Sequence, residues 1–411
     1  MAKVMITVWL MQEHEQLVRN TILPEFRKLH PDIDVILTTT SWHYLWDKVV
    51  MFSKKKQGPD VLQIGNTWNG VLAHLGALKD ISSHVEKIGG LNSFVPAAAR
   101  LCTFPRTNKV SSVPWYLDVR ALYYRKDVLK DNFITEQNLR TVEDLSRACM
   151  KIHGEKVNNR EVAAFGMSGQ RDAQLVHNVA PWIWNFGGEF LGPNGKTVHF
   201  NSDRSLTGIK AYFDLISKYS DKDDILQSQE TYMENFMVKG KYSLGFFGPW
   251  VNNTYLNPNN QAYNKISAHI SCAYMPAGPN GHYTFLGGSN LAISEFSQHA
   301  EAAWLFVSYM LKRKVQEQFC SANNQLPSLL DCYSPMFMVD NPRNKVLKES
   351  VRYGRSLPNS ESWAEIEDIL IEYFHQVLVS IKEGIYTEDL LSSQINEAAE
   401  KSELILKTER Q

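Results

Sequence analysis

The sequence predicts an α/β protein that opens with a doubly wound parallel sheet. Apolar runs of strand length alternate with segments whose apolar residues recur at helical spacing. The predicted order is strand 4–10, helix 15–29, strand 33–37, helix 44–57 and strand 61–64. Parallel strands need helical crossovers between them, so this order favours a parallel sheet flanked by helices.

Local breakers set the boundaries of these elements. The first strand is a continuous apolar run, typical of a buried strand. Pro31 ends the first helix because proline cannot continue the hydrogen-bond ladder. The turn Gly58-Pro59 separates the second helix from the third strand.

The remaining chain continues to alternate and becomes helical toward its end. Expected elements are strand 119–124, helix 141–152, helix 208–219, a loop and strand at 284–294, helix 300–311 and helix 363–381. Thr141 should cap the first of these helices, with Asp144 three residues later. Ser297 can cap the helix at 300–311.

Composition narrows the class of protein. The chain has 411 residues, a length that suggests two or three domains at about 150 residues each. Its 43 basic and 44 acidic residues give a net charge of -1, which argues against a dedicated nucleic-acid surface. No apolar run reaches the roughly 20 residues that span a bilayer. Ten Trp and 17 Tyr exceed what a plain core requires and favour a recognition surface.

Cysteine spacing and known motifs predict neither a cofactor nor a metal site. The five cysteines contain no CxxC pair; five buried thiols are favoured, although Cys320 and Cys332 could be bridged in an oxidising compartment. GxGxxG, GxxxxGK[ST], HExxH, GxSxG and SxxK are all missing from the sequence. The first residues lack a signal-peptide pattern, so we expect either a cytosolic protein or an exported one whose signal is not in this sequence.

Five ordered segments resemble the extracellular solute-binding proteins of ABC importers, in the sugar-binding branch that contains the relatives of maltose-binding protein. The segments are GPDVLQIGNTW at 58–68, VPWYLDVRALYYRKDVL at 113–129, GKYSLGFFGPW at 240–250, MPAGPNG with GGSNLAIS within 275–294, and AAWLFVSYML leading to LPS at 326–328. Each segment is weakly specific alone, but the ordered set covers residues from about 3 to 380.

The resemblance implies a two-lobed periplasmic-binding-protein-like fold of type II, with a ligand cleft between the lobes. The expected lobes are 1–114 plus 275–325 and 117–272 plus 327–411, joined by crossings near 113–118, 271–275 and 325–328. It also implies a monomer that works with the transmembrane subunits of an ABC permease. The expected location is periplasmic, or extracellular as a membrane-anchored lipoprotein.

Ligand contacts are expected where parallel strands end, because ligands of open α/β sheets bind beyond the carboxyl ends of the strands. A sugar needs flat aromatic rings for its C–H faces and charged or amide groups for its hydroxyls. The strand-end loops contribute Glu13, His14, Trp42, Asn66 and Trp68. For each of these, an exposed loop or rim packing is the alternative.

Other candidates are placed by matching the family's segments. Asp118 matches a ligand-binding carboxylate at a lobe crossing; a salt bridge with Arg120 or Arg125 is the alternative. Trp250 matches a stacking tryptophan, with packing beneath its lobe as the alternative. The remaining candidates are Trp115, which is next to the same crossing, Gly288 and Ser289, where glycine would admit the ligand or form a tight turn, and Arg355, which could grip an acidic group or be solvated. Trp182, Trp184 and Trp363 fit the core better.

The sequence therefore favours a non-enzymatic receptor for a mono- or oligosaccharide. One alternative is a glycoside hydrolase that uses Asp118 with Glu13 or Glu189, since paired carboxylates have no fixed separation in sequence. Another keeps the fold but binds a non-sugar solute such as a polyamine or a metal ion. That site would need clustered carboxylates or Tyr and His ligands, whereas these loops offer mainly Trp.

Overall fold

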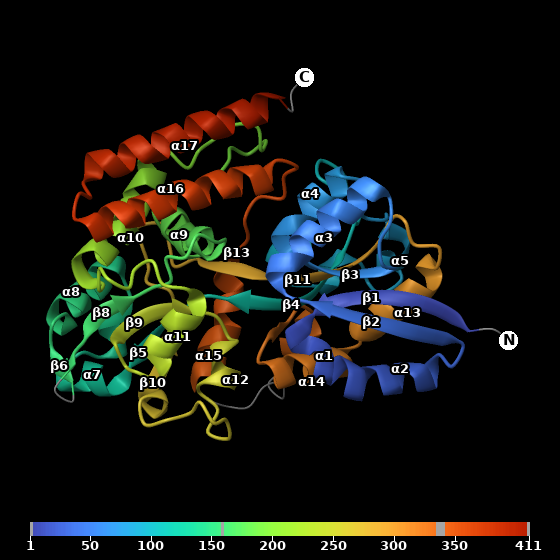
Figure 1. The fold of residues 1–411 in the computed structure, drawn as a ribbon, viewed down its shortest axis with the longest axis horizontal. Helices are drawn as coiled ribbons and strands as arrows, with labels where there is room; N and C mark the ends of the chain where they lie inside the picture. The colour runs from blue at the N-terminus through green and yellow to red at the C-terminus, as the bar shows by residue number, and fades with distance from the viewer. Residues whose placement is uncertain (1–2, 158–159, 334–341, 409–411) are drawn as a thin grey trace. The chain divides into compact units, whose positions relative to one another are not determined.

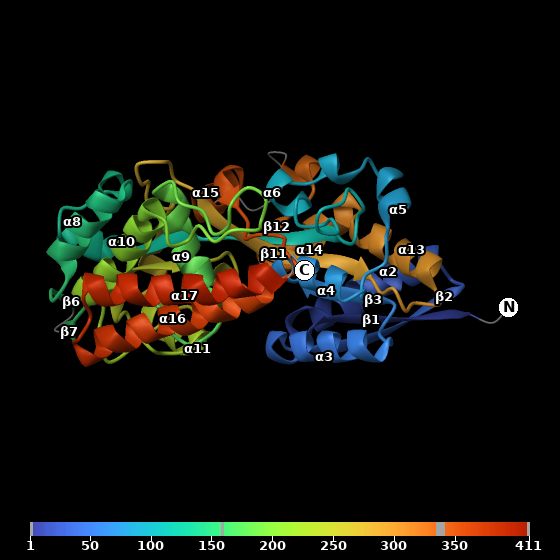
Figure 2. The same cartoon turned by 90° about the horizontal axis from the view of Figure 1, so that it is seen from above.

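A computed structural model describes residues 3–157, 160–333 and 342–408. The chain divides into two compact units. Unit 1 comprises Met1–Asp118, Leu286–Met338 and Asn359–Ala364, and unit 2 comprises Val119–Phe285, Val339–Pro358 and Glu365–Gln411. Figures 1 and 2 show the elements of both units in two perpendicular views.

Unit 1 is built on a mixed sheet in the order β12-β4-β11-β3-β1-β2. Its strands are β1 (Val4–Met11), β2 (Ile33–Thr40), β3 (Val61–Gly65), β4 (Val113–Val119), β11 (Thr284–Ile293) and β12 (Leu326–Pro327). Strand β1 runs parallel to both β2 and β3, as the sequence predicts. Strand β11 is antiparallel to β3, and β12 is antiparallel to β4.

Helices cover both faces of this sheet because its strands are apolar on both sides. The helices are α1 (Glu15–Leu17), α2 (Leu23–Leu29), α3 (Trp42–Lys55), α4 (Asn69–His74), α5 (Ser82–Glu86), α6 (Pro96–Ala99), α13 (Ala300–Met310) and α14 (Arg313–Asn323). On one face Ile6, Val8 and Leu10 of β1 join a core with α2 and α13. On the other face Met11 packs with α3 and α4.

The predicted helix 15–29 is helical throughout but not regular. A π-helical segment, Val18–Ile22, lies between α1 and α2. Pro24 follows it in the first turn of α2. Proline has no N–H to donate and its ring would clash with the carbonyl four residues earlier, which accounts for the wider turn before it.

Unit 2 has a smaller mixed sheet in the order β10-β5-β9-β8. Its strands are β5 (Ala121–Arg125), β8 (Ala163–Gly166), β9 (Tyr242–Phe247) and β10 (Ile270–Ala273), with a hairpin of β6 (Lys156–Val157) and β7 (Arg160–Glu161) and the short β13 (Gly354–Arg355) beside the start of β11. Strands β8 and β9 are parallel, while β5 is antiparallel to both β9 and β10.

Unit 2 also contains nine α-helices in the described residues, of which the last two, α16 and α17, lie side by side (Figures 1 and 2). The nine helices are α7 (Lys126–Asp131), α8 (Val142–Ile152), α9 (Gln174–Asn185), α10 (Asp203–Tyr219), α11 (Gln229–Met237), α12 (Val251–Thr254), α15 (Pro342–Ser350), α16 (Trp363–Glu383) and α17 (Glu388–Thr408). Thr141 caps α8 by accepting a hydrogen bond from Asp144 N, which confirms the predicted cap.

Two local predictions are wrong. The segment 284–294 is not a loop followed by a strand, because β11 begins at Thr284. Ser297 does not cap the next helix: His299 is the N-cap of α13, and the Ser297 hydroxyl instead donates to Asp60 Oδ1 at 2.5 Å. Both differences depend on hydrogen-bond partners distant in the sequence.

The cysteines and the predicted core tryptophans are buried. All five cysteines are free, which confirms the favoured prediction. Burial raises the pKa of the Cys102 thiol to about 12, so the thiol is neutral and unreactive. The side chains of Trp182, Trp184 and Trp363 are also buried, as predicted. In the described parts of the chain, no helix has the length and apolar character that crossing a membrane requires.

Candidate functional site

In unit 1, three parallel strands end next to one another. Met11 at the end of β1 lies opposite Thr40 at the end of β2, and β3 pairs with the other side of β1. The chain then forms the 3-10 turns Gln12–His14 and Asn66–Trp68 and the start of α3. We call these segments the unit 1 strand-end cluster. Parallel topology brings them together although they are distant in sequence.

An aromatic group with a polar partner occupies this cluster. Trp42 is 37% exposed, and its indole Nε1 donates a hydrogen bond to Glu13 Oε1 at 3.1 Å. The Trp68 ring meets Trp42 edge-on, with ring centroids 5.5 Å apart, and packs against Trp46 at 5.2 Å. Partial burial raises the pKa of Glu13, although its side chain is still half exposed. The group offers apolar rings beside a carboxylate, the combination that a hydroxylated ring can use.

His14 and Trp115 support the cluster from the core of unit 1. His14 is 1% exposed; its Nε2 lies 3.2 Å from Tyr116 Oη and its Nδ1 3.4 Å from Asn323 Oδ1. Burial lowers the pKa of His14 to about 4, so the imidazole is neutral at pH 7. Trp115 is fully buried, with its ring centroid 4.2 Å from that of Phe319. Both side chains were candidates for ligand contact, and the structure places them behind the surface.

Ser289 is also buried, in a network centred on Gln63. The Gln63 amide nitrogen donates to Ser289 Oγ and Tyr116 Oη, both at 3.0 Å, and its carbonyl accepts from Met11 N at 2.9 Å. These bonds join β1, β3, β4 and β11 at the level of the strand ends. Ser289 therefore positions strands, and nothing in its contacts requires a ligand.

The remaining candidates in unit 1 are Gly288, Asn66 and Asp118, and packing within the unit explains only the first. Gly288 has φ +130°, and an added Cβ would lie 2.2 Å from Tyr116 O, so chain packing accounts for this glycine. Asn66 is 4% exposed, and its amide nitrogen finds no hydrogen-bond acceptor in the part of the chain that the structure describes. Asp118 is partly exposed near the end of β4.

In unit 2, the ends of β8 and β9 form a second cluster. These strands are parallel, so the loops 167–173 and 248–250 leave the same edge of the sheet. We call these loops, with Gln174, the unit 2 strand-end cluster. Trp250 is partly exposed, and the Arg120 guanidinium lies 4.6 Å from its ring centroid. A Cβ at position 248 would lie 1.8 Å from the indole, so only glycine lets the ring lie there.

Sequence reasoning missed two polar residues of this cluster, Asp172 and Gln174. Gln174 Oε1 accepts a hydrogen bond from Arg120 Nη2 at 2.8 Å, and Gln174 N donates to Asp172 Oδ1 at 2.8 Å. Burial raises the pKa of Asp172, whose side chain is partly buried. The sequence signal that could have identified them is the polar run SGQRDAQ at 168–174. This run follows β8, whose parallel neighbour β9 also leads into a loop.

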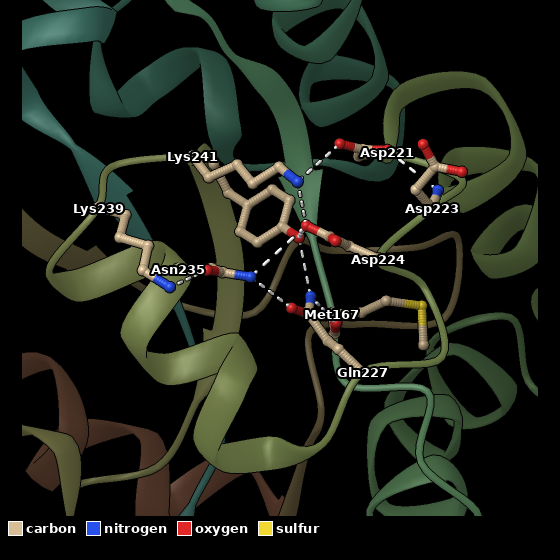
Figure 3. Close-up of polar contacts among 9 residues, drawn as sticks. Met167, Asp221, Asp223, Asp224, Gln227, Asn235, Lys239 and Lys241 are labelled. Atoms are coloured by element: carbon tan, nitrogen blue, oxygen red, sulfur yellow. Dashed lines mark hydrogen bonds and ion pairs between the residues drawn. The ribbon is translucent and has the colours of Figure 1, made fainter.

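A polar network fixes the start of that loop (Figure 3). Gln227 Nε2 donates to Met167 O at 2.9 Å and to Tyr242 Oη at 2.8 Å. The Tyr242 hydroxyl in turn donates to Asp224 Oδ2 at 2.7 Å. Ser168 Oγ also donates to Gln227 O, at 3.1 Å. The loop therefore leaves β8 from a rigid base.

Two of the acidic residues in Figure 3, Asp221 and Asp224, are compensated by a lysine within the network. Lys241 forms ion pairs with both Asp221 and Asp224. Burial raises the pKa of Asp224, but hydrogen bonds from Lys241 and Tyr242 outweigh it and hold the pKa below its usual value. This cluster is an internal ion-pair network. Across the described residues, no group of three His, Cys, Asp or Glu side chains could hold a metal ion.

Arg355 is already engaged within unit 2. Its Nη2 lies 2.9 and 2.8 Å from the two carboxylate oxygens of Glu189. Its guanidinium lies 5.0 Å from the ring centroid of Trp184 and 5.1 Å from that of Tyr283. An acidic ligand would have to compete with Glu189 for this arginine.

Comparison with known proteins shows which family the chain belongs to. The model of the bacterial extracellular solute-binding protein family matches residues 13–317. A probable ABC transporter-binding protein of Deinococcus radiodurans is 24% identical over 289 residues, which cover 68% of this chain and 64% of that protein. The diacetylchitobiose binding protein DasA of Streptomyces coelicolor is 24% identical over 339 residues, 80% of this chain and 73% of that protein.

Solved structures share the fold over nearly the whole chain. A solute-binding protein of Thermotoga lettingae, bound with alpha-D-tagatose, superposes with a TM-score of 0.83 at 22% identity and covers 98% of this chain and 100% of its own. The sugar-binding protein MalE of Xanthomonas citri gives 0.82 at 21% identity, covering 99% and 98%. The fold is therefore the type II periplasmic-binding-protein fold, and the chain belongs to the bacterial extracellular solute-binding protein family.

Proposed function

We propose that this protein is the substrate-binding component of an ABC importer and that it captures a mono- or oligosaccharide. The carrying observation is that each unit places tryptophan beside hydrogen-bonding side chains where its parallel strands end. In unit 1 these are Trp42 and Trp68 with Glu13. In unit 2, Trp250 lies beside Arg120, which donates to Gln174, and Gln174 N donates in turn to Asp172. Indole faces suit the C–H faces of a sugar, and the polar groups suit its hydroxyls.

The names of relatives support this ligand class. They include a diacetylchitobiose binding protein and maltooligosaccharide solute-binding lipoproteins of Streptococcus pneumoniae. We propose that the ligand contacts come from Glu13, Trp42, Asn66, Trp68, Asp118, Trp250 and Arg355, extended by Asp172 and Gln174. His14, Trp115, Gly288 and Ser289 would support these contacts from behind, because their surroundings within unit 1 already account for them.

We propose that binding proceeds by closure of two lobes, 1–114 plus 275–325 and 117–272 plus 327–411, about crossings near 113–118, 271–275 and 325–328. The closed receptor would deliver the sugar, chemically unchanged, to the transmembrane subunits of a permease. It would act outside the cell membrane as a monomer, either free in the periplasm or anchored by a lipid. Family membership supports the extracellular setting.

Calorimetric titration with a panel of neutral mono- and oligosaccharides tests the proposal. We expect at least one sugar to bind, and Trp250→Ala to weaken it about tenfold, the order expected when an aromatic contact is lost. Trp182→Phe is the matched control, because Trp182 is a buried tryptophan of the same unit. Mass spectrometry of the recovered sugar should show no cleavage. Cleaved product, or binding confined to non-sugar solutes, would contradict the proposal.

A further inference from the structure

Arg120 is a buried cation next to two aromatic rings of unit 2. It lies between the end of β4 and the start of β5 and is 2% exposed. Its guanidinium carbon lies 4.6 Å from the ring centroid of Trp250 and 5.2 Å from that of Phe285. Guanidinium groups are planar and weakly hydrated, so they stack on aromatic faces in positions where an ammonium group would keep its water.

Further contacts fix the arginine itself. Arg120 O accepts a hydrogen bond from Thr284 Oγ1 at 2.7 Å, which holds its backbone against β11. Its Nη2 donates to Gln174 Oε1 at 2.8 Å, which ties the guanidinium to the unit 2 strand-end cluster. The Phe285 ring is stacked in turn on His177, with centroids 4.1 Å apart and planes 13° from parallel. Arg120 thus has an anchored backbone, and its guanidinium has a side-chain acceptor and an aromatic neighbour that is itself stacked.

Trp250 lies next to this arrangement. It lies at the N-cap of α12, a helix of only four residues, and follows Gly248 and Pro249. Glycine at 248 removes the side chain that would otherwise contact the indole. The Arg120 guanidinium is a planar neighbour of this ring.

We propose that Arg120 is a positioning residue that fixes the Trp250 indole in the orientation in which it stacks on a sugar. This inference rests on the proposed function, since it assigns Trp250 to the sugar site. Arg120 acts through Trp250 and Gln174 and needs no contact with the ligand. A ring that is already restricted in the free protein loses less conformational entropy when the ligand binds. This smaller entropic cost raises the affinity.

The test combines ¹⁹F NMR of protein labelled with 5-fluorotryptophan with calorimetric sugar titration. The Trp250 resonance, one of ten, is assigned from its loss in Trp250→Phe. We expect Arg120→Met to shift and broaden this resonance more than the other nine and to weaken sugar binding about tenfold. Arg120→Lys, which keeps the charge but loses the plane, should give a smaller change in both.

Two variants keep the result interpretable. Gln174→Met removes one hydrogen-bond acceptor of Arg120 without removing the buried charge, so it should shift the same resonance even if Arg120→Met does not fold. Arg125→Met is the matched control, because Arg125 is equally buried in unit 2 but bonds to Asp127 and Gly240 O. It should leave the Trp250 resonance and the affinity unchanged.

The inference is overturned if Arg120→Met and Gln174→Met leave the Trp250 resonance where it is in the wild type. It is also overturned if Arg125→Met shifts that resonance equally. If the wild type binds no sugar, the proposed function fails. In that case the ¹⁹F NMR spectra still show whether Arg120 positions Trp250. A failure of the proposed function can therefore be distinguished from a failure of this inference.

Discussion

The carboxylate of Glu13 accepts a hydrogen bond from the indole nitrogen of Trp42 at 3.1 Å, across 29 residues of sequence. Glu13 follows β1, and Trp42 opens the helix after β2. The bond orients an exposed ring and leaves the second carboxylate oxygen for other partners. It also predicts how acidity and substitution should affect binding.

We expect Glu13→Ala to weaken sugar binding about tenfold, because it removes the acceptor that holds Trp42. Glu13→Gln keeps an acceptor and should stay within about threefold of wild type. Burial raises the pKa of Glu13, so this carboxylate is protonated at a higher pH than an exposed glutamate. Acidification should therefore weaken wild-type binding. Calorimetry across pH should show this loss reduced in Glu13→Gln. The exposed Glu86→Gln is the control, and an unchanged pH profile in Glu13→Gln would contradict the assignment.

His14 should make the fold sensitive to acid. Burial lowers its pKa to about 4 in the folded protein, while the unfolded chain takes up a proton near pH 6.5. Stability from this group is complete above about pH 6.5 and is lost as pH falls toward 4. Between pH 7.5 and 5 the loss should be about 2 kcal/mol.

Urea denaturation at both pH values measures this effect. In His14→Gln the part of the pH dependence that comes from His14 should disappear, although the variant is less stable at pH 7.5. His299→Gln, at an exposed position, should keep the wild-type pH dependence. A pH dependence in His14→Gln equal to that of wild type would show that His14 is not the group responsible.

Gly288→Ala should destabilise unit 1 by about 3 kcal/mol or more, because it adds a steric conflict to backbone strain. The new Cβ would lie 2.2 Å from Tyr116 O at φ +130°. Gly195→Ala is the matched control: φ is +68° there, but no atom lies within 4 Å of an added Cβ. It should cost about 1 kcal/mol. Equal losses in chemical denaturation would show that the close approach to Tyr116 does not matter.

The pair formed by Arg355 and Glu189 predicts which acidic sugars bind. In the wild type, glucuronate should bind no better than glucose, since Glu189 occupies the guanidinium. Glu189→Gln should raise glucuronate affinity about fivefold and leave glucose affinity unchanged. The double variant Glu189→Gln, Arg355→Met should lose that gain. If Glu189→Gln leaves the affinities for both sugars unchanged, Arg355 does not contact the ligand.

Local periodicity was sufficient to predict the first elements of unit 1. The apolar runs and helical spacing of the first 65 residues gave β1, α3 and β3 nearly in place, because these elements are recognisable from contacts within each segment. The irregular π segment before Pro24 was not predicted, although proline itself was a local signal. The start of β11 was missed because its pairing with β13 joins residues about 70 positions apart.

The candidate site was predictable only in part. The parallel strand order predicted that Trp42 and Trp68 lie in loops at the same edge of the sheet, and the structure brings their ring centroids to 5.5 Å. His14 lies between Glu13 and Glu15 in the sequence, yet its ring points into the core. There its two ring nitrogens form hydrogen bonds with Tyr116 and Asn323. No pattern within a 3-10 turn distinguishes these neighbours. The same holds for Gln174, whose role depends on a guanidinium 54 residues away.

The sequence by itself determined the alternation of strands and helices, the parallel start of the first sheet and, through the order of its segments, the family. These properties depend on short-range periodicity and on the chain order of motifs. The tertiary structure decided which side chains at the strand ends reach the surface and which are buried supports. That choice depends on packing and on hydrogen bonds between distant segments, so Glu13 holds a tryptophan while its neighbour His14 is fixed in the core.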